Sequence, residues 1–456
     1  MDFGAGRVAL VSGSTGERLD AHLTATDPHG TAAVLQSMKG APGGFAGLDQ
    51  SGTIPLTQLP ADGRYAPAST TPTNPVGLYV PPGWGQRWRS KRDAAKAGTG
   101  KAVVAAVGSS TFMGLYSSNP PVKGTVGTIA SGLQSLYGDG GSGYSTSAWN
   151  PVTLSDETPA AISLWTGNGS VLGLTGTGWG EGGQLAGPGC HYLITSNPGD
   201  SVTFKVRGSR VVIYTLGKDG GRASWTYSID GGQAVTVTDT VNGTLTPIAT
   251  TISGLTATTH TVTIKHAGTS GQYLSVSGVS GENSTGVVVN NFARSGAIAS
   301  SYSQSGRITW NGGPDYPADL LLYCVGANDA YRGTAVDSWS ASVRQFLQSV
   351  MDGTSASGVA STGTTDVVIV MQHIGKMDTA NWRYHDYIAR GRGIAEAYGA
   401  AFINIWPMGR NSWNYWNSLG YWGNGSNPAV SGSDSIHMCD AGHAAVANAI
   451  LPVLTS

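Results

Sequence analysis

Residues 101–111 read KAVVAAVGSST, a continuous apolar run that ends in a Gly-Ser-Ser turn. A run that is apolar at every position is typical of a parallel strand whose two faces are both covered. Similar runs occur at 286–293, 319–325, 366–372 and 400–406, with helical stretches expected at 127–137, 334–351, 380–398 and 440–453. This alternation predicts a three-layer α/β/α domain with a parallel sheet.

Residues 150–285 break the alternation. They read as short strands with alternating polar and apolar residues, separated by Gly, Asn and Asp turns. The segments are SVTFKV (201–206), RVVIYTL (210–216), ASWTYSID (223–230), QAVTVTD (233–239) and HTVTIKH (260–266). This pattern predicts an antiparallel β-sandwich inserted between two parts of the α/β domain, which span 76–149 and 286–456.

Residues 1–75 read as irregular, because turn formers interrupt every apolar stretch. A linker and an assembly segment both fit such a composition. The N-terminus lacks the basic and apolar regions of a signal peptide, and no apolar run approaches the roughly 20 residues that span a bilayer. The formal net charge of -1 gives no general attraction to nucleic acid or to an anionic membrane.

Candidate reactive residues follow the predicted strands, at the edge where sites form in α/β sheets. Ser110 follows the first strand, Gly296 the second and Asn328 the third, whereas Asp434 and His437 precede the last helix. Taken alone, each of these residues has a simpler explanation. Ser110, Asn328 and Asp434 could cap helices, Gly296 is one of 68 glycines, and His437 could be a surface residue.

Together, the blocks GSS (108–110), Gly296, GAND (326–329) and DSIH (434–437) resemble those of SGNH (GDSL-type) hydrolases, in the family's order. The resemblance covers 101–149 and 286–456 and implies a flavodoxin-like sheet and a serine esterase. It implies Ser110 as nucleophile, His437 as base and Asp434 as the residue that orients the base. Ser109 departs from the family, which usually has Asp there, and this puts the local hydrogen bonds in doubt.

The implied mechanism is physically reasonable. A serine hydroxyl needs a base within hydrogen-bond reach, and an imidazole suits this role because its pKa lies near neutral. Attack on an ester creates an oxyanion, which the Ser110 N–H, the Gly296 N–H and the Asn328 side chain would hold. This chemistry requires no cofactor and no metal. The sequence has no G-x-S-x-G or H-E-x-x-H motif, and its three cysteines show no ligand spacing.

Aromatic residues are dense between the fifth strand and the Asp434–His437 block. We expect Trp406, Trp413 and Trp416 to contact substrate by stacking on sugar rings, together with His373 after the fourth strand. A hydrophobic lid without sugar preference fits the same residues. The predicted sandwich resembles carbohydrate-binding modules. Its place between a helix and a strand favours the opposite edge of the sheet, although it could curl back to the site.

The run DAHLTATDPHGTAAVL followed by GGFAGLDQSGTIPLTQLP resembles leader segments of bacteriophage tail proteins, especially those of actinobacterial phages. This implies a virion protein that acts at the host cell surface, with a host envelope glycan and other tail proteins as partners and a homotrimer as one candidate assembly. We expect it to remove acyl groups, such as O-acetyl, from that glycan. An inactive receptor-binding tail protein and a secreted bacterial esterase are the alternatives.

Overall fold

The chain divides into two units, Met1–Pro75 and Val76–Ser456. The computed structural model describes residues 77–146, 171–182, 187–217, 221–238, 246–303, 318–351, 365–373, 375, 382–409, 412–424, 427–431 and 436–456. The predictions for the N-terminal unit and for Asp434 lie outside these residues.

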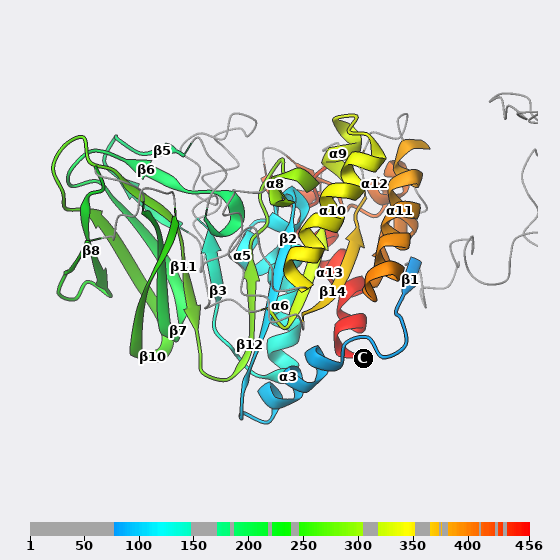
Figure 1. The fold of residues 1–456 in the computed structure, drawn as a ribbon, viewed down its shortest axis with the longest axis horizontal. Helices are drawn as coiled ribbons and strands as arrows, with labels where there is room; N and C mark the ends of the chain where they lie inside the picture. The colour runs from blue at the N-terminus through cyan, green and yellow to red at the C-terminus, as the bar shows by residue number, and fades with distance from the viewer. Residues whose placement is uncertain are drawn as a thin grey trace, which may run out of the picture. The chain divides into compact units, whose positions relative to one another are not determined.

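A six-stranded sheet forms the centre of the α/β domain (Figure 1). The five predicted apolar runs supply five parallel strands, and a short strand that was not predicted pairs antiparallel at one edge. In spatial order the strands are β1 (Gly77–Tyr79), β15 (Ala401–Asn404), β14 (Asp366–Met371), β13 (Leu320–Cys324), β2 (Lys101–Gly108) and β12 (Gly286–Asn291).

The continuous apolar runs follow from cover on both faces of this sheet. In β2, Val104 and Ala106 belong to one hydrophobic core, whereas Ala105 and Val107 belong to the other. Successive side chains of a strand point to opposite faces, so both sets must be apolar when helices lie on both sides. The predicted three-layer fold is therefore confirmed.

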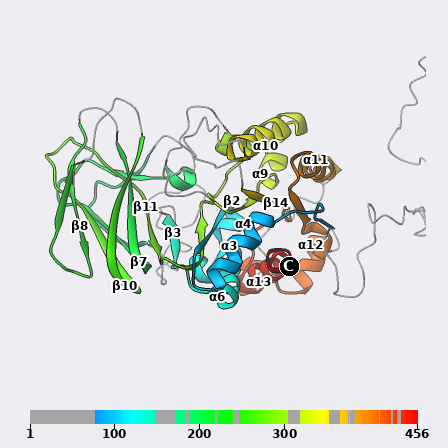
Figure 2. The same cartoon turned by 60° about the horizontal axis from the view of Figure 1, so that its bottom comes forward.

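Helices pack on the two faces, as Figures 1 and 2 show for α10 and α11 on one side and α6 and α13 on the other. None of the helices among the described residues is long and apolar enough to cross a membrane. One face carries α3 (Gln86–Lys96), α4 (Ser110–Met113), α5 (Pro120–Lys123), α6 (Thr125–Tyr137), α12 (Trp413–Ser418) and α13 (Asp440–Thr455); the other carries α8 (Ala299–Ser303), α9 (Ala327–Tyr331), α10 (Val336–Met351) and α11 (Trp382–Tyr398).

The insertion forms a nine-stranded antiparallel sheet, drawn in green in Figure 1. Residues from both halves of its two longest strands, buried or partly buried, contribute to one shared core, so the sheet folds back on itself. Its strands are β3 (Gly143–Thr146), β4 (Val171–Thr175), β5 (Gly180–Glu181), β6 (Leu193–Thr195), β7 (Ser201–Gly217), β8 (Ser224–Ile229), β9 (Val235–Thr238), β10 (Thr246–His266) and β11 (Leu274–Glu282). Short elements elsewhere are η3 (Pro188–Cys190), η5 (Trp406–Gly409), β16 (Gly423–Asn424) and β17 (Asn427–Ser431).

Strand β7 is one continuous strand, although the sequence suggested two strands separated at Gly208–Ser209. Even-numbered residues such as Phe204 and Val206 face the core before this point, and odd-numbered residues such as Val211 and Ile213 face it afterwards. The pairing of β7 with β10 changes register at the same place. Gly208 allows this because a Cβ atom at that position would lie 2.3 Å from the backbone N of Glu282. A close backbone approach, and not a turn, accounts for the glycine.

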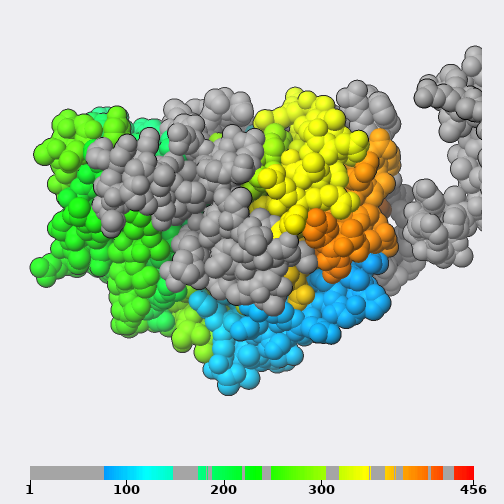
Figure 3. Space-filling view, viewed as in Figure 1, coloured from blue at the N-terminus to red at the C-terminus, as the bar shows by residue number. Residues whose placement is uncertain are grey.

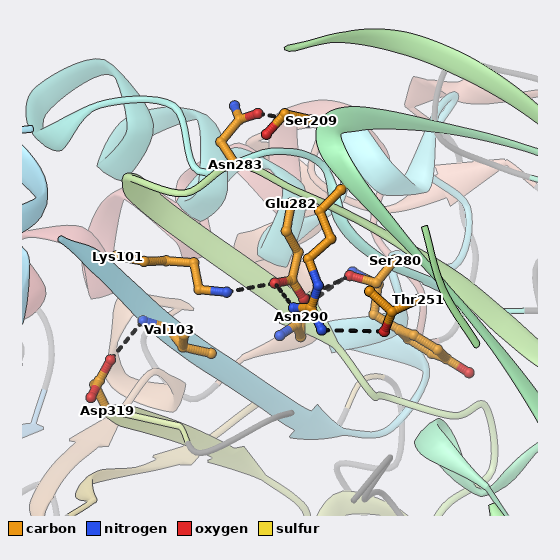
Figure 4. Close-up of polar contacts among 11 residues, drawn as sticks. Lys101, Val103, Ser209, Thr251, Ser280, Glu282, Asn283, Asn290 and Asp319 are labelled. Carbon is orange, nitrogen blue, oxygen red and sulfur yellow. Dashed lines mark hydrogen bonds and ion pairs between the residues drawn. The ribbon is translucent and has the colours of Figure 1, made fainter. Parts of the chain in front are cut away.

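The inserted sheet packs directly on the α/β domain. The Tyr144 N–H of β3 donates to Asn290 Oδ1 of β12 at 2.9 Å, and Tyr214 of β7 lies in the same core as Val107 of β2. Figure 4 shows a polar junction beside it: Glu282, only 1% exposed, accepts from Lys101 at 2.5 Å and from Arg210 at 3.2 Å. The two parts are thus joined by apolar packing and a buried carboxylate.

Candidate active site

Three of the predicted site residues follow adjacent parallel strands. Strands β12, β2 and β13 are neighbours, so their carboxyl ends meet at one edge. Ser110 begins α4 directly after β2 and is 6% exposed. Gly296, with φ +70°, lies in the segment after β12, and Asn328 lies in α9 after β13. The topology therefore brings these three residues to the same edge of the sheet.

The turn before Ser110 is held by neutral hydrogen bonds. The Ser109 hydroxyl donates to Gln372 Oε1 at 3.2 Å, and the Gly108 carbonyl accepts from the Tyr302 hydroxyl at 2.7 Å. Gly108 has no room for a side chain, because a Cβ atom would lie 2.8 Å from Phe112 Cβ and 3.0 Å from the Cys324 carbonyl oxygen. These contacts fix the backbone that presents Ser110.

Helix α9 clamps the segment that carries Gly296. Asn328 Nδ2 donates to the Ala297 carbonyl at 3.0 Å, and the Arg332 guanidinium donates to the Gly296 carbonyl at 3.1 Å. The Asp329 carboxylate accepts from the Ala299 N–H. Helix capping was the simpler explanation for Asn328, but the N-cap is Gly326, and the side chains of Asn328 and Asp329 both bond to the neighbouring segment.

Asp329 has an unusual electrostatic environment. It is 1% exposed, and burial raises the pKa of its carboxyl from 3.8 to about 6, although the Ala299 N–H and the charge of Arg332 oppose this rise. Burial disfavours the charged form of an acid. The clamp therefore contains a carboxyl group that ionises close to neutral pH.

His437 lies near the chain that leaves Ser110. The Ser110 carbonyl accepts from the Leu115 N–H at 3.0 Å, and the ring of the next residue, Tyr116, makes an edge contact with the His437 ring at 5.0 Å between centroids. The Gly423 N–H donates to the His437 carbonyl at 2.8 Å. Asp434, the predicted orienting residue, lies outside the described residues.

The predicted substrate-binding aromatics lie in the core and not on an open surface. Trp406 is 4% exposed, Trp413 is 6% exposed and Trp416 is 2% exposed. Trp413 stacks on Trp422 at 5.8 Å, an arrangement that packs the segment before His437. High aromatic density indicated a sugar-binding surface, but burial leaves these three rings little surface for stacking on sugars.

His373 contacts the segment that leads to His437. It is 1% exposed, its ring lies 5.3 Å from that of Trp416, and its Nε2 donates to the Ile436 carbonyl at 2.9 Å. Ile436 directly precedes His437 in the chain. The structure therefore places His373 as a support for the histidine segment, where the sequence suggested substrate contact.

His443 is structural, as its place in the last helix suggested. It is fully buried, its Nδ1 accepts from the Thr125 hydroxyl at 2.9 Å, and its Nε2 donates to the Leu115 carbonyl at 3.0 Å. Burial lowers the pKa of His443 to about 4, so the ring stays neutral.

The inserted sheet reaches the segment after β12. The Tyr144 ring of β3 lies 5.1 Å from the ring of Phe292, the residue that follows β12, and His191 of the insertion is buried. Burial and then the charge of Arg294 lower the pKa of His191 to about 3. Arg294 lies two residues before Gly296, so the insertion extends towards the carboxyl edge of the sheet, one of the two positions that the sequence left open.

The described residues hold no group of three or more His, Cys, Asp and Glu side chains that could bind a metal ion. The sequence pointed to several contributors to this site, but it missed Gln372, Tyr116 and Arg332. Gln372 directly follows β14 and Arg332 directly follows α9, and both are weak signals that many residues share. The contact of Tyr116 depends on chain folding alone.

A known protein family matches part of this chain. Residues 254–445 match the GDSL-like Lipase/Acylhydrolase family. This range includes Gly296, Asn328, Asp434 and His437, whereas Ser110 lies before it, separated by most of the inserted sheet. No curated protein matches the chain in a sequence search.

One solved structure shares the fold over most of the chain. A structure described as "Peptidoglycan O-acetylesterase in action" is 16% identical, covers 84% of this chain and 98% of its own, and has a TM-score of 0.56. A carbohydrate esterase family 2 enzyme with a carbohydrate binding domain, from Corynascus thermopiles (Myceliophthora fergusii), is 13% identical over 61% of this chain and 98% of its own. Its TM-score is 0.27, too low to support an argument. The family match and the fold together support an SGNH-type hydrolase, an esterase that acts on ester bonds.

Proposed function

We propose that this protein is a serine esterase that removes O-acetyl groups from a glycan of a bacterial cell surface, as part of a phage tail. Ser110 attacks the ester carbonyl, His437 takes the hydroxyl proton and returns it to the leaving sugar oxygen, and Asp434 orients the imidazole. A water molecule, activated by His437, then releases acetate. The tail role rests on the leader in residues 1–75.

One observation carries this proposal: the segments of Ser110, Gly296 and Asn328 follow neighbouring strands and are bonded to one another. The Asn328 amide has two N–H groups. One holds the Ala297 carbonyl, and we assign the other to the oxyanion, together with the backbone N–H groups of Ser110 and Gly296. Preorganised donors of this kind stabilise the transition state without reorganising during the reaction.

The glycan substrate is proposed because the solved structure that shares the fold over most of the chain is described as a peptidoglycan O-acetylesterase. The inserted sheet, which reaches the segment after β12, is a second wall against which a polymer could lie. Envelope material from a bacterial host, treated with the protein, should release acetate, and mass spectrometry should show the matching loss from the glycan.

The substitution Ser110→Ala tests the chemistry. It removes the nucleophile, so hydrolysis of p-nitrophenyl acetate should fall by at least about 10³-fold. Ser340→Ala, which alters a buried serine of α10, is the matched control and should retain most of the activity. Turnover by Ser110→Ala at the wild-type rate would refute the assignment.

The alternative, an inactive receptor-binding protein, is favoured by Ser109 at the position where the family usually has Asp. The wild-type protein decides between the two. Hydrolysis of acetyl, butyryl or octanoyl nitrophenyl esters supports the enzyme, whereas tight binding to host envelope without hydrolysis of any ester supports the receptor-binding role.

A further inference from the structure

Tyr331 is an exposed aromatic residue beside the candidate oxyanion donors. Its side chain is 70% exposed, the largest value among the exposed large hydrophobic residues of the described chain. A single exposed apolar residue is ordinary and carries no meaning alone. The position of Tyr331 is what distinguishes it, because it ends α9, the helix that carries Asn328.

Spacing puts Tyr331 on the same side of α9 as Asn328, one of the candidate oxyanion donors. Residues three and four apart are neighbours on a helix surface. Asn328 lies three residues before Tyr331 and bonds to the Ala297 carbonyl, and Arg332, which follows Tyr331 in the chain, bonds to the Gly296 carbonyl. Tyr331 therefore stands at the border of the candidate site. Figure 3 shows, in yellow, that the region of α9 and α10 is exposed on this face.

The helix that carries Tyr331 is held firmly. The buried Asp329 carboxylate bonds to the Ala299 N–H, and the Arg332 N–H donates to the Asn328 carbonyl at 2.9 Å. A tyrosine side chain has only two χ angles, so on a fixed backbone it loses little conformational entropy when a ligand binds to it. An exposed ring on a fixed helix is thus suited to bind a flat apolar surface.

The exposure of Tyr331 also limits the chemistry of its ligand. A sugar ring has one apolar C–H face and a polar rim, so it can pack on one aromatic face while its hydroxyls stay in water. A long acyl chain would instead need an enclosed apolar channel. A cavity of about 260 Å³ in the described chain lies away from α9, where Val126 of α6 and Arg207 of β7 are among its lining residues.

We propose that the exposed face of α9 is a binding subsite in which Tyr331 stacks on a sugar ring next to the one that carries the acetyl group. This subsite rests on the proposed glycan esterase function. Arg332 borders it and can donate to a ring hydroxyl with the N–H groups that the Gly296 carbonyl does not use. Tyr331 is a positioning residue and takes no part in the bond changes.

The test compares two substrates, partly O-acetylated chitotriose and p-nitrophenyl acetate. Tyr331→Ala should raise KM for the acetylated trisaccharide about tenfold while kcat changes by less than about twofold, and the change in kcat/KM on the small ester should be several-fold smaller. Tyr331→Trp should restore KM, because stacking requires only an aromatic face. Leu136→Ala, at an exposed hydrophobic residue of α6, is the control for loss of an exposed apolar side chain away from the subsite.

The outcomes separate the subsite from the enzyme. If wild-type protein hydrolyses neither substrate, the esterase function fails and the subsite with it. If it hydrolyses only the small ester, the esterase stands and the sugar subsite is refuted. Equal losses of Tyr331→Ala on both substrates, with no rescue by Tyr331→Trp, would mean a structural role and would also refute the subsite.

Discussion

The buried carboxyl of Asp329 should make the stability of this protein depend on pH. Its folded-state pKa is about 6 against an ordinary value of 3.8. The folded state therefore holds a proton that the unfolded state releases in this window, and stability falls as pH rises from about 4 through about 6. In the substitution Asp329→Asn this dependence should disappear, because an amide does not ionise here.

The magnitude follows from the shift. A difference of about two pKa units corresponds to about 3 kcal/mol at full ionisation. Part of the unfolded-state ionisation has already occurred at pH 4, so the free energy of unfolding of wild-type protein should fall by about 2 to 3 kcal/mol relative to Asp329→Asn between about pH 4 and about pH 8. The side chain is 1% exposed, so screening by solvent is small.

Urea unfolding followed by tryptophan fluorescence at several pH values measures this difference. The comparison uses the slope of unfolding free energy against pH in each protein. A constant cost of placing an amide beside the Ala299 N–H therefore does not affect it. Asp337→Asn is the control, because Asp337 is exposed and its surface ion pair with Arg390 contributes little. If the stabilities of Asp329→Asn and wild type change in parallel with pH, the electrostatic account of Asp329 is wrong.

Two further substitutions test the packing around the site. Glu282→Ala should lower the free energy of unfolding by about 2 to 3 kcal/mol, because it leaves Lys101 and Arg210 facing each other with partial solvent access. Glu396→Ala, at an exposed ion pair with Arg392, is the control. An equal loss of stability in the two variants would contradict the inference. Gly108→Ala should reduce ester hydrolysis by about 10²-fold, since its Cβ would displace Phe112 and the turn before Ser110. Gly393→Ala is the control and should retain activity, because a Cβ there meets nothing within 4 Å. Normal turnover by Gly108→Ala would show that the turn tolerates movement.

The parallel strands could be predicted from sequence because their burial leaves a local signal. In β13, Leu322 and Tyr323 enter different cores, so every position is apolar. Strand β1 left no such signal, because three residues paired at an edge need no particular composition. The continuity of β7 was also hidden, since a glycine at a turn and a glycine at a close backbone contact look the same in a sequence.

Parallel topology also made the candidate site partly predictable. Residues that follow adjacent parallel strands come to one edge whatever lies between them, which is why Ser110 and Asn328 could be associated across more than two hundred residues. The bonds that hold these segments could not be predicted, because Ser109 and Gln372 have no shared periodicity or spacing. The burial of the tryptophans before His437 could not be predicted either, because their frequency says nothing about which rings become buried.

The departure at Ser109 follows from its surroundings. Ser109 is 1% exposed, and Gln372 Oε1 accepts both from its hydroxyl and from the Cys324 thiol. Burial raises the pKa of that thiol well above its usual range, so it stays protonated and can donate. An aspartate at 109 would bury a negative charge in a site closed to water, a costly arrangement. A serine donates its O–H to Gln372 without adding a charge, so the turn before Ser110 is held without a carboxylate.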